Sequence, residues 1–202
     1  MRGRRSGSFL PGPASCIREV VWEAGFGSRG TSGRRGRTEV IRMRIAVGTD
    51  ERTHLVDAVL DELERRGHEV LYSGPGKGED SVDWPEVTLA AVNRVKQGQA
   101  DEAIVMCWTG TGCSIVANKV PGIRAALCHD AETARGARVW NHANVLALSL
   151  RATPEAIVKE ILDRWFETPF SDDEWNRRQI ERVREVEERT ESSSDRERPL
   201  TS

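Results

Sequence analysis

The sequence predicts an α/β fold in the three-layer, Rossmann-like arrangement: a five-stranded parallel sheet with helices on both faces, plus an extended C-terminal helix. Short apolar runs alternate with amphipathic segments of helical period along residues 43–188, and glycine-rich turns separate several of them. Such alternation is typical of strand–helix–strand units, whose crossover helices cover both faces of a parallel sheet. With 202 residues and 38% hydrophobic content, the chain is large enough for one domain with a real core.

The predicted strands are five apolar runs, at residues 44–49, 69–73, 102–107, 124–128 and 144–150. Amphipathic segments predict helices that end at Gly67, that run from Asp83 to about Gly98 and from residue 131 to 140, and that begin after Thr153. Asp83 is the expected N-cap of its helix, because Pro85 lies in the first turn and Glu86 completes a capping-box-like pair.

The last helix differs from the others in its charge. Ser171 and Glu174 form a capping box at its start, and it is expected to reach about residue 188. Ile180 and Val183 are among its few apolar residues, too few for a helix buried within one subunit. We therefore expect this helix to pack across a subunit interface.

The two ends of the chain differ in composition from residues 43–188. Residues 1–42 hold nine arginines, three glutamates and eight of the 18 glycines. We expect a disordered extension, or upstream sequence translated before a true start at Met43; an arginine-rich targeting peptide and a nucleic-acid-binding arm are the alternatives. Residues 189–202 are rich in Ser, Arg and Glu and are expected to form a disordered tail.

The chain is organised around residues 107–114, where a buried strand meets a glycine-rich turn and a helix start. Such a turn presents free backbone N–H groups and the positive end of a helix dipole, which favour an anion or a developing negative charge. Cys107 ends the strand at this spot, and its thiol is a candidate base or nucleophile. The alternative is an ordinary buried strand cysteine.

In parallel α/β sheets, ligands bind beyond the carboxyl ends of the strands. Asp50 and Glu51 follow the first predicted strand, and the turn at 107–114 follows the third. We assign the loop just before Asn144 to the same edge of the sheet. We expect these three segments to be neighbours in space.

Composition excludes several classes of function. A net charge of −2 gives no electrostatic case for nucleic acid, and no apolar stretch approaches the roughly 20 residues of a membrane span. The four cysteines show no paired spacing, so free thiols in a reducing cytoplasm are expected. The four histidines show no ligand spacing with them, and no metal is expected.

Residues 107–126 read Cys-x-Thr-Gly-x-Gly-x-Ser-Ile-x-Ala-Asn-Lys-Val-Pro-Gly-Ile-Arg-Ala-Ala. This string resembles the signature of the ribose-5-phosphate isomerase B / galactose-6-phosphate isomerase family, and further matches run from about residue 43 to 183. The resemblance implies a cofactor-free aldose–ketose isomerase of carbohydrate metabolism, acting through an enediolate. Ribose 5-phosphate, of the pentose phosphate pathway, is the default substrate; another pentose, tetrose or hexose phosphate stays open. It also implies a homodimer or dimer of dimers with the site at the subunit interface.

The resemblance assigns roles within the turn. The cysteine matching Cys107 is the proton-transferring base, and the threonine matching Thr109 assists it. In the family, the backbone N–H groups that hold the enediolate belong to the stretch that matches Gly110, Thr111, Gly112 and Ser114.

Four residues before the turn also match or replace family positions. Asp50 and Asp83 match aspartates of the family, and the resemblance implies that the aspartate matching Asp50 helps to position the substrate. Glu51 stands where histidine is usual and Trp84 where tyrosine is common. The alternative for Asp50 and Glu51 is an acid pair at a helix start, and the alternative for Trp84 is an aromatic that braces the proline turn.

The largest departures are two tryptophans. Trp140 occupies the place of the ring-opening histidine, next to the retained Asn141, and Trp108 fills a small glycine position. His142 is the candidate to take over the acid–base role, and a polar loop histidine is the alternative. Two indoles suggest a reshaped site for a shorter sugar, or for an open-chain sugar that needs no ring opening.

Phosphate recognition is partly altered. Arg151 and Arg178 fit two arginine positions that hold phosphate in the family, whereas Glu174 replaces a third and Arg177 is the candidate to compensate. Arg138 matches a further family arginine. Each of these has the alternative of a solvated arginine on a helix face. A non-catalytic sugar-phosphate-binding protein on the same fold is therefore the second hypothesis.

Overall fold

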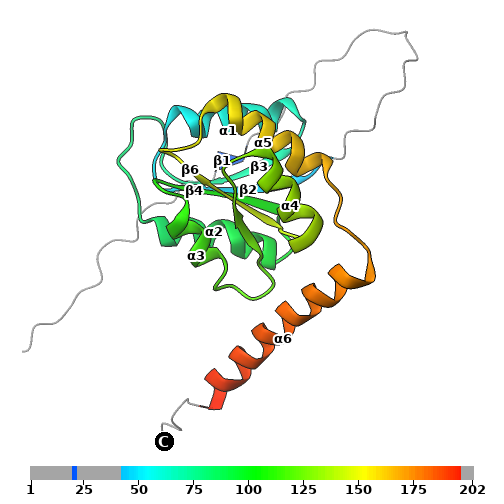
Figure 1. The fold of residues 1–202 in the computed structure, drawn as a ribbon. Helices are drawn as coiled ribbons and strands as arrows, with labels where there is room; N and C mark the ends of the chain where they lie inside the picture. Colours follow the sequence, from blue (N-terminus) through cyan, green and yellow to red (C-terminus); the bar gives the residue numbers. More distant parts are fainter. Residues whose placement is uncertain (1–19, 22–41, 197–202) are drawn as a thin grey trace, which may run out of the picture.

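A computed structural model describes residues 20–21 and 42–196 of the chain (Figure 1). Its sheet has the order β1-β3-β2-β4-β6-β5. The strands are β1 (Val20–Val21), β2 (Arg44–Thr49), β3 (Glu69–Ser73), β4 (Glu102–Cys107), β5 (Ala125–Leu127) and β6 (Val145–Ser149). The helices are α1 (His54–Arg65), α2 (Trp84–Lys96), α3 (Thr111–Ala117), α4 (Ala131–Asn141), α5 (Glu155–Glu167) and α6 (Glu174–Arg196).

The five expected strands pair in parallel, so the predicted fold class is confirmed. The short strand β1 was not predicted; it pairs antiparallel with β3 at one edge of the sheet. The expected extension otherwise lies outside the described residues, apart from Arg42 at its end.

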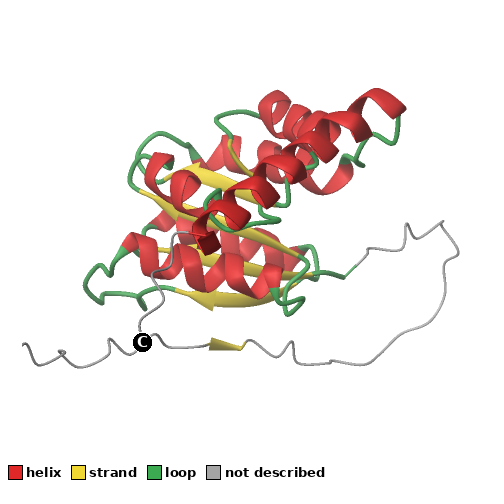
Figure 2. Cartoon of the chain, turned by 90° about the horizontal axis from the view of Figure 1, so that it is seen from below, coloured by secondary structure: helices red, strands yellow, loops and turns green. Residues whose placement is uncertain are grey.

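Helices cover both faces of the sheet, which gives three layers (Figure 2). One face packs on α1, α4 and α5 through a cluster that includes Ile104 and Trp165. The other packs on α2 and α3 through small side chains, among them Val105 and Ala117. Neighbouring residues of β4 thus serve opposite faces, as the two-residue period of a strand requires.

A buried ion pair ties β4 to α4 at the amino end of the sheet. Glu102 Oε1 lies 2.6 Å from Arg138 Nη1, and Glu102 Oε2 accepts a hydrogen bond of 2.6 Å from the indole of Trp165. Burial raises the pKa of the Glu102 carboxyl, against the opposing effect of Arg138. Arg138 also lies over the ring of Phe170, so it is a buried structural arginine rather than one on a solvated face.

Helix capping differs from the prediction in two places. Asp83 precedes α2 as its N-cap residue, but its side chain makes no capping hydrogen bond. At α6, Asp173 Oδ1 accepts a hydrogen bond of 3.0 Å from the Asn176 amide, so Asp173 and not Ser171 is the cap. Aspartate and serine are about equally good caps, and three polar residues in succession leave the sequence ambiguous here.

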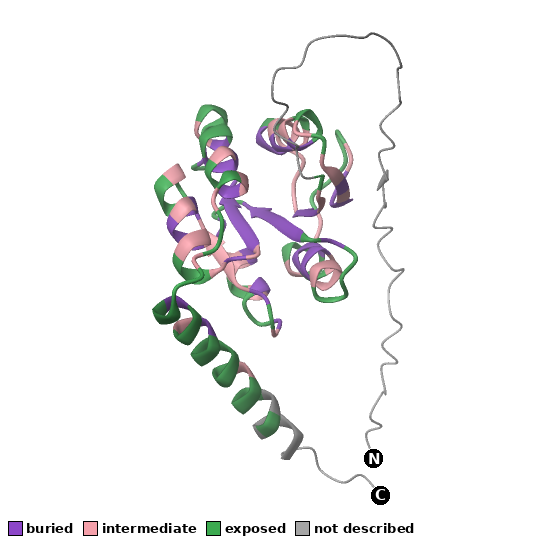
Figure 3. Ribbon diagram, turned by 90° about the vertical axis from the view of Figure 1, so that its right-hand side faces the viewer, coloured by how far each residue is buried: buried purple, intermediate pink, exposed green. Residues whose placement is uncertain are grey.

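Helix α6 leaves the body of the protein and continues to Arg196, beyond the expected end near residue 188 (Figures 1 and 3). The tail expected at 189–202 is therefore helical up to that residue, and the rest lies outside the described residues. Ile180 is buried, whereas Trp175, Val183 and Val186 remain exposed along the helix. Within the described ranges, none of the helices has the length and apolar character needed to cross a bilayer.

Candidate active site

The turn after β4 depends on a glycine. Gly110 has φ +74°, a left-handed conformation that favours glycine, and its amide donates to the Cys107 carbonyl at 3.1 Å. A Cβ at this position would lie 2.6 Å from Leu127 Cδ1 and 2.9 Å from the Leu148 carbonyl carbon. The glycine therefore lets the chain reverse tightly against β5 and β6 and begin α3 directly beyond Cys107.

This turn makes Cys107 a strong acid for a thiol. A hydrogen bond from the Cys113 thiol and backbone N–H groups of Cys113, Gly110 and Thr109 lower the pKa of Cys107 to about 5, against the opposing effect of burial. The thiolate is therefore the main form near neutral pH, and a thiolate is the reactive form of cysteine. Its side chain is buried at the carboxyl end of the sheet.

Asp50 lies close to this thiolate, because β2 and β4 are neighbouring strands that end together. Burial raises the pKa of Asp50 to about 6, and the negative charges of Cys107 and Glu51 add to the effect. Its Oδ1 atom is buried without a hydrogen-bond partner. A carboxyl with a raised pKa and a thiol with a lowered pKa therefore face the same spot.

The indole of Trp84 forms a wall beside the turn. A Cβ on Gly112 would lie 3.2 Å from two of its ring carbons, so the indole packs directly on the glycine backbone. Asp83, the residue before Trp84, is exposed. Trp84 therefore lies at the turn itself, and it is still 41% exposed to solvent.

Hydroxyl groups and a backbone contact complete this edge. Thr109 Oγ1 and Thr111 Oγ1 are 2.6 Å apart, and Ser114 is half-buried in the first turn of α3. The Trp108 carbonyl accepts hydrogen bonds from the Arg151 amide at 3.1 Å and from Ser149 Oγ at 3.0 Å. The Trp108 and Arg151 side chains are both exposed.

Most of the predicted site residues therefore meet at the carboxyl end of the sheet. They are Asp50, Glu51, Asp83, Trp84, Cys107, Trp108, Thr109, Gly110, Thr111, Gly112, Ser114 and Arg151. A thiolate, a carboxyl whose pKa is raised to about 6 and several backbone donors are the kinds of group that proton abstraction beside a carbonyl group requires. Among the described residues there is no group of three or more His, Cys, Asp or Glu side chains that is placed to hold a metal ion.

Comparison with known proteins decides the family. The family model described as Ribose/Galactose Isomerase matches residues 45–186. The chain belongs to the ribose/galactose isomerase family. It is therefore an enzyme, a sugar-phosphate isomerase, as its relatives are.

Three similar proteins illustrate the range of this family. D-erythrulose-4-phosphate isomerase of Pectobacterium atrosepticum is 38% identical over 130 residues, which cover 63% of this chain and 85% of that protein. Ribose-5-phosphate isomerase B of Escherichia coli is 32% identical over 147 residues, which cover 72% and 97%. The structure of the Clostridium thermocellum ribose-5-phosphate isomerase B has a TM-score of 0.69 at 38% identity and covers 73% and 99%.

The isomerase does not bring every expected residue to Cys107. Trp140, Asn141 and His142 lie at the amino end of β6, because α4 runs antiparallel to the strands and returns the chain to that end. The expectation that the loop before Asn144 neighbours the turn at 107–114 within one chain is therefore wrong. Along β6, the separation between the two ends is about 13 Å.

His142 has a different environment from the one predicted. Its φ is +47°, its ring stacks on Phe170, and Nε2 lies 2.7 Å from the Ser171 carbonyl oxygen. These contacts hold the segment before α6 against the end of α4. The acid–base role is not supported within one chain, because this environment fits the alternative of a structural loop histidine.

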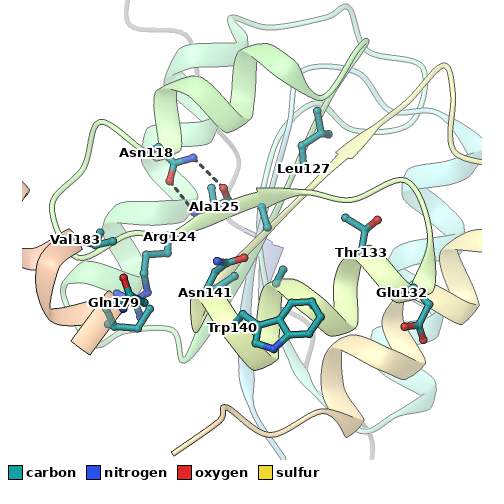
Figure 4. Close-up of a pocket in the computed structure, with 15 residues that line it drawn as sticks. Asn118, Arg124, Ala125, Leu127, Glu132, Thr133, Trp140, Asn141, Gln179 and Val183 are labelled. Carbon is teal, nitrogen blue, oxygen red and sulfur yellow. Dashed lines mark hydrogen bonds between the residues drawn. The ribbon is translucent and has the colours of Figure 1, made fainter. Parts of the chain in front are cut away.

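Trp140, Asn141 and α6 instead border a groove of about 590 Å³ between β5, α4 and α6 (Figure 4). The indole of Trp140 covers Gly136, where a Cβ would lie 2.9 Å from a ring carbon. At the other end of the groove lies Leu127, whose side chain also lines the Gly110 turn. Ser171, just before α6, contacts His142, and Gln179 lines the groove beside Ala125, so the part of α6 that carries the exposed Arg178 also lies at the amino end of the sheet.

Sequence reasoning missed the close partner of the Cys107 sulfur. Cys113 follows six residues later, and in the sequence it was only one of four cysteines without paired spacing. The available signal was its place in the first turn of the helix, which points back at the end of the strand.

Proposed function

We propose that the enzyme interconverts an aldose phosphate and a ketose phosphate through an enediolate, with the Cys107 thiolate as the base. The thiolate takes the proton from the carbon next to the carbonyl and returns it to the neighbouring carbon. No oxidant, reductant or cofactor is needed, because the two carbons exchange oxidation states within one molecule. The observation that carries this proposal is the position of Cys107 at the end of β4 against the Gly110 turn, whose backbone N–H groups, together with the Cys113 thiol, lower the pKa of Cys107 to about 5.

The turn and Asp50 have complementary roles in this proposal. Negative charge develops on the substrate oxygen in the transition state, where backbone N–H groups and the Thr109 hydroxyl are placed to stabilise it. Asp50 has a pKa of about 6, which suits a group that positions the substrate hydroxyl and exchanges a proton with it. Trp84, which packs on Gly112, and Trp108, Glu51 and Asp83 are assigned to the border of the substrate-binding space in this proposal.

Ribose 5-phosphate, converted to ribulose 5-phosphate, is the default substrate. A tetrose 4-phosphate is the second candidate, and Trp140 favours it. With phosphate on O4, a four-carbon sugar has no hydroxyl left to close a five-membered ring, so no ring-opening histidine is needed. A relative named D-erythrulose-4-phosphate isomerase, 38% identical to this chain, supports the same candidate.

We also propose a homodimer, or a dimer of dimers, with each site shared between two subunits. Trp140, Asn141 and Arg178 lie at the opposite end of the sheet from Cys107, so they reach a catalytic turn only when they come from a second copy. The exposed Val183 and Val186 on α6 and the open groove beside Trp140 provide apolar surface for that copy. Arg151 and the partner's Arg178 would then hold the phosphate.

The proposed location is the cytoplasm. Cys107, Cys113 and Cys128 are free thiols, and thiolate chemistry at Cys107 requires that it stay reduced.

The decisive experiment is solvent deuterium incorporation into aldose and ketose phosphates of about four to six carbons. Exchange at the carbon beside the carbonyl, lost in Cys107→Ala, supports both the enediolate and the base. Exchange retained in that variant would keep the isomerase but move the base elsewhere. The absence of exchange with every sugar would favour a non-catalytic sugar-phosphate-binding protein.

A further inference from the structure

Strand β5 forms one edge of the sheet, and the side chain of Asn118 closes that edge (Figure 4). Just before β5, the Arg124 carbonyl accepts hydrogen bonds from the Asn144 and Val145 amides, on the side of β6. Because successive residues of a strand direct their peptide groups to alternate sides, the N–H and C=O groups of Ala125 point away from β6. Asn118 Oδ1 accepts from the Ala125 amide and Asn118 Nδ2 donates to the Ala125 carbonyl, both at 2.9 Å. The carboxamide therefore takes the place that a neighbouring strand would have.

The same carboxamide also binds helix α3, which begins at the Gly110 turn. Asn118 follows the last residue of α3, and its Nδ2 donates a hydrogen bond of 2.9 Å to the Ser114 carbonyl oxygen. That oxygen also accepts from the Asn118 amide at 3.1 Å. The side chain thus uses both of its amide hydrogens and its oxygen on backbone groups, and it joins α3 to the outer edge of β5.

A continuous line of peptide hydrogen bonds leads from Asn118 to Cys107. The Ser114 amide donates to the Gly110 carbonyl at 3.2 Å, and the Gly110 amide donates to the Cys107 carbonyl at 3.1 Å. Helix α3 is only seven residues long, and a helix of this length has little stability of its own. Its position therefore depends on the contacts that hold its two ends.

We propose that Asn118 is a positioning residue for the isomerase reaction, which holds the end of α3 against β5 and thereby keeps the Gly110 turn in place around Cys107. This inference rests on the proposed role of Cys107 and of the turn that follows it. Asn118 acts on Cys107 through the peptide groups of α3. Small displacements of catalytic groups are costly, since a misplacement of about 1 Å can reduce a rate on the order of a hundredfold.

Asn144 offers a matched control in the same loop. Its Oδ1 accepts a hydrogen bond of 2.8 Å from the Arg124 amide, and its Nδ2 donates one of 2.9 Å to the Gly122 carbonyl. Neither partner belongs to α3. Asn144→Ala therefore removes a similar set of side-chain hydrogen bonds from the connection between α3 and β5 and leaves the contact with Ser114 intact.

The first measurement does not depend on catalysis. Hydrogen–deuterium exchange of the full-length protein, followed by mass spectrometry of its peptides, reports the local opening of α3. In Asn118→Ala we expect the amides of residues 111–117 to exchange about tenfold faster than in wild type, because the hydrogen bonds at the end of the helix are lost. Asn144→Ala should leave these rates within about twofold of wild type. Equal acceleration in the two variants, or none in Asn118→Ala, would overturn the proposal.

Asn118→Asp separates hydrogen bonding from the space that the side chain fills. Aspartate has nearly the same shape, but its carboxylate has no hydrogen to donate and would set negative oxygens against the Ser114 and Ala125 carbonyl groups. We therefore expect α3 to exchange at least as fast in this variant as in Asn118→Ala. If Asn118→Asp is instead close to wild type, the side chain only fills space and the proposal is wrong.

Kinetics of the same variants separate this inference from the proposed function. A displaced turn weakens groups that act in the transition state, so Asn118→Ala should lower kcat about tenfold and leave KM within about twofold. Asn144→Ala should keep at least about half of the wild-type kcat. Faster exchange of α3 with an unchanged kcat would refute the positioning role and leave the proposed function standing. If wild type itself acts on no sugar phosphate, the proposed function fails and the positioning role fails with it, whereas the exchange rates would still show that Asn118 holds α3.

Discussion

The indole of Trp84 rests on the backbone of Gly112, so that a Cβ there would lie 3.2 Å from two of its ring carbons. This contact joins the start of α2 to the turn that carries Cys107. We expect Gly112→Ala to push the indole outward and to lower kcat/KM about tenfold, which is about 1.4 kcal/mol of transition-state stabilisation. Steady-state kinetics on the substrate found by deuterium exchange checks this.

A compensating variant separates this contact from a general defect of the turn. In Gly112→Ala/Trp84→Leu the smaller side chain makes room for the added methyl group, and at least half of the loss in log kcat/KM should be recovered. A double variant that is no better than Gly112→Ala would show that the glycine matters for another reason, such as its own amide.

We expect the ionised Asp50 carboxylate to lower the free energy of unfolding. Its pKa of about 6 lies above the ordinary 3.8, so the native state holds this proton more tightly than the unfolded state. Stability from this group is therefore lost as pH rises from about 4 to about 6, and the loss persists above that range. Because the side chain is partly solvated, we expect Asp50→Asn to raise the free energy of unfolding at pH 7.5 by only about 1 kcal/mol.

Urea unfolding at two pH values tests this together with activity. Near pH 4 the wild type and Asp50→Asn should have nearly equal stability, because Asp50 is then largely protonated in the native state. The variant should lose most of its isomerase activity at both pH values. A variant less stable than wild type at pH 7.5 would contradict the assigned direction.

The fold class could be predicted from the sequence because the apolar runs of its strands are distinct. The run Glu102–Cys107 is apolar apart from its first residue, and the glycine-rich stretch after it predicts a turn. The positions of Asp50 and Cys107 at one end of the sheet then followed from parallel pairing. The assignment of the family's roles to these residues stays a prediction.

The predictions that failed concerned the end of the sheet at which a segment lies and contacts between elements that are distant in the sequence. Residues 140–142 were grouped with Cys107, although a segment that precedes a strand lies at its amino end. The burial of Arg138 against Glu102 and Trp165 has no signature in a local window, because the three residues come from three separate elements. The lowered pKa of Cys107 likewise depends on the geometry of the turn.

The pair Glu102 and Arg138 should be among the costliest to break. Glu102→Ala leaves a buried guanidinium without its counter-charge and the Trp165 indole without its acceptor, so we expect a loss of about 3–5 kcal/mol in the free energy of unfolding. Glu181→Ala breaks an exposed pair with Arg184 and should cost less than about 1 kcal/mol. Urea unfolding measures both.

Replacing both members of the buried pair shows why Glu102→Ala lowers the stability. Glu102→Leu/Arg138→Met removes both charges and keeps side chains of similar length, so most of the stability lost in Glu102→Ala should return. If the double variant is as unstable as Glu102→Ala, the lost indole hydrogen bond and packing, rather than the unpaired charge, would be the cause.

A shared site predicts that two inactive variants restore each other. Cys107→Ala is defective at the carboxyl end of the sheet, and Asn141→Ala/Arg178→Ala is defective at the amino end. When the two are refolded together, about half of the dimers contain both chains, and each of these has one intact site. We therefore expect about a quarter of wild-type activity from the mixture.

The matched control mixes two variants defective at the same end. Cys107→Ala and Asp50→Asn together leave every site with at least one defect, so activity should stay at the level of the separate variants. Equal recovery in both mixtures, or none in the first although mixed dimers form, would rule out a site divided in this way.

Trp140→His tests whether the indole selects against sugars that form rings. The indole N–H donates a hydrogen bond but exchanges no proton near neutral pH, whereas an imidazole does both. We expect the variant to raise kcat/KM for ribose 5-phosphate at least tenfold relative to a tetrose 4-phosphate, since general acid–base assistance commonly contributes about a hundredfold or more. Trp175→His replaces an indole of similar exposure on α6 and should leave that ratio unchanged. If Trp140→His changes both substrates equally, ring opening is not what Trp140 controls, and the case for a four-carbon substrate would rest on sequence similarity alone.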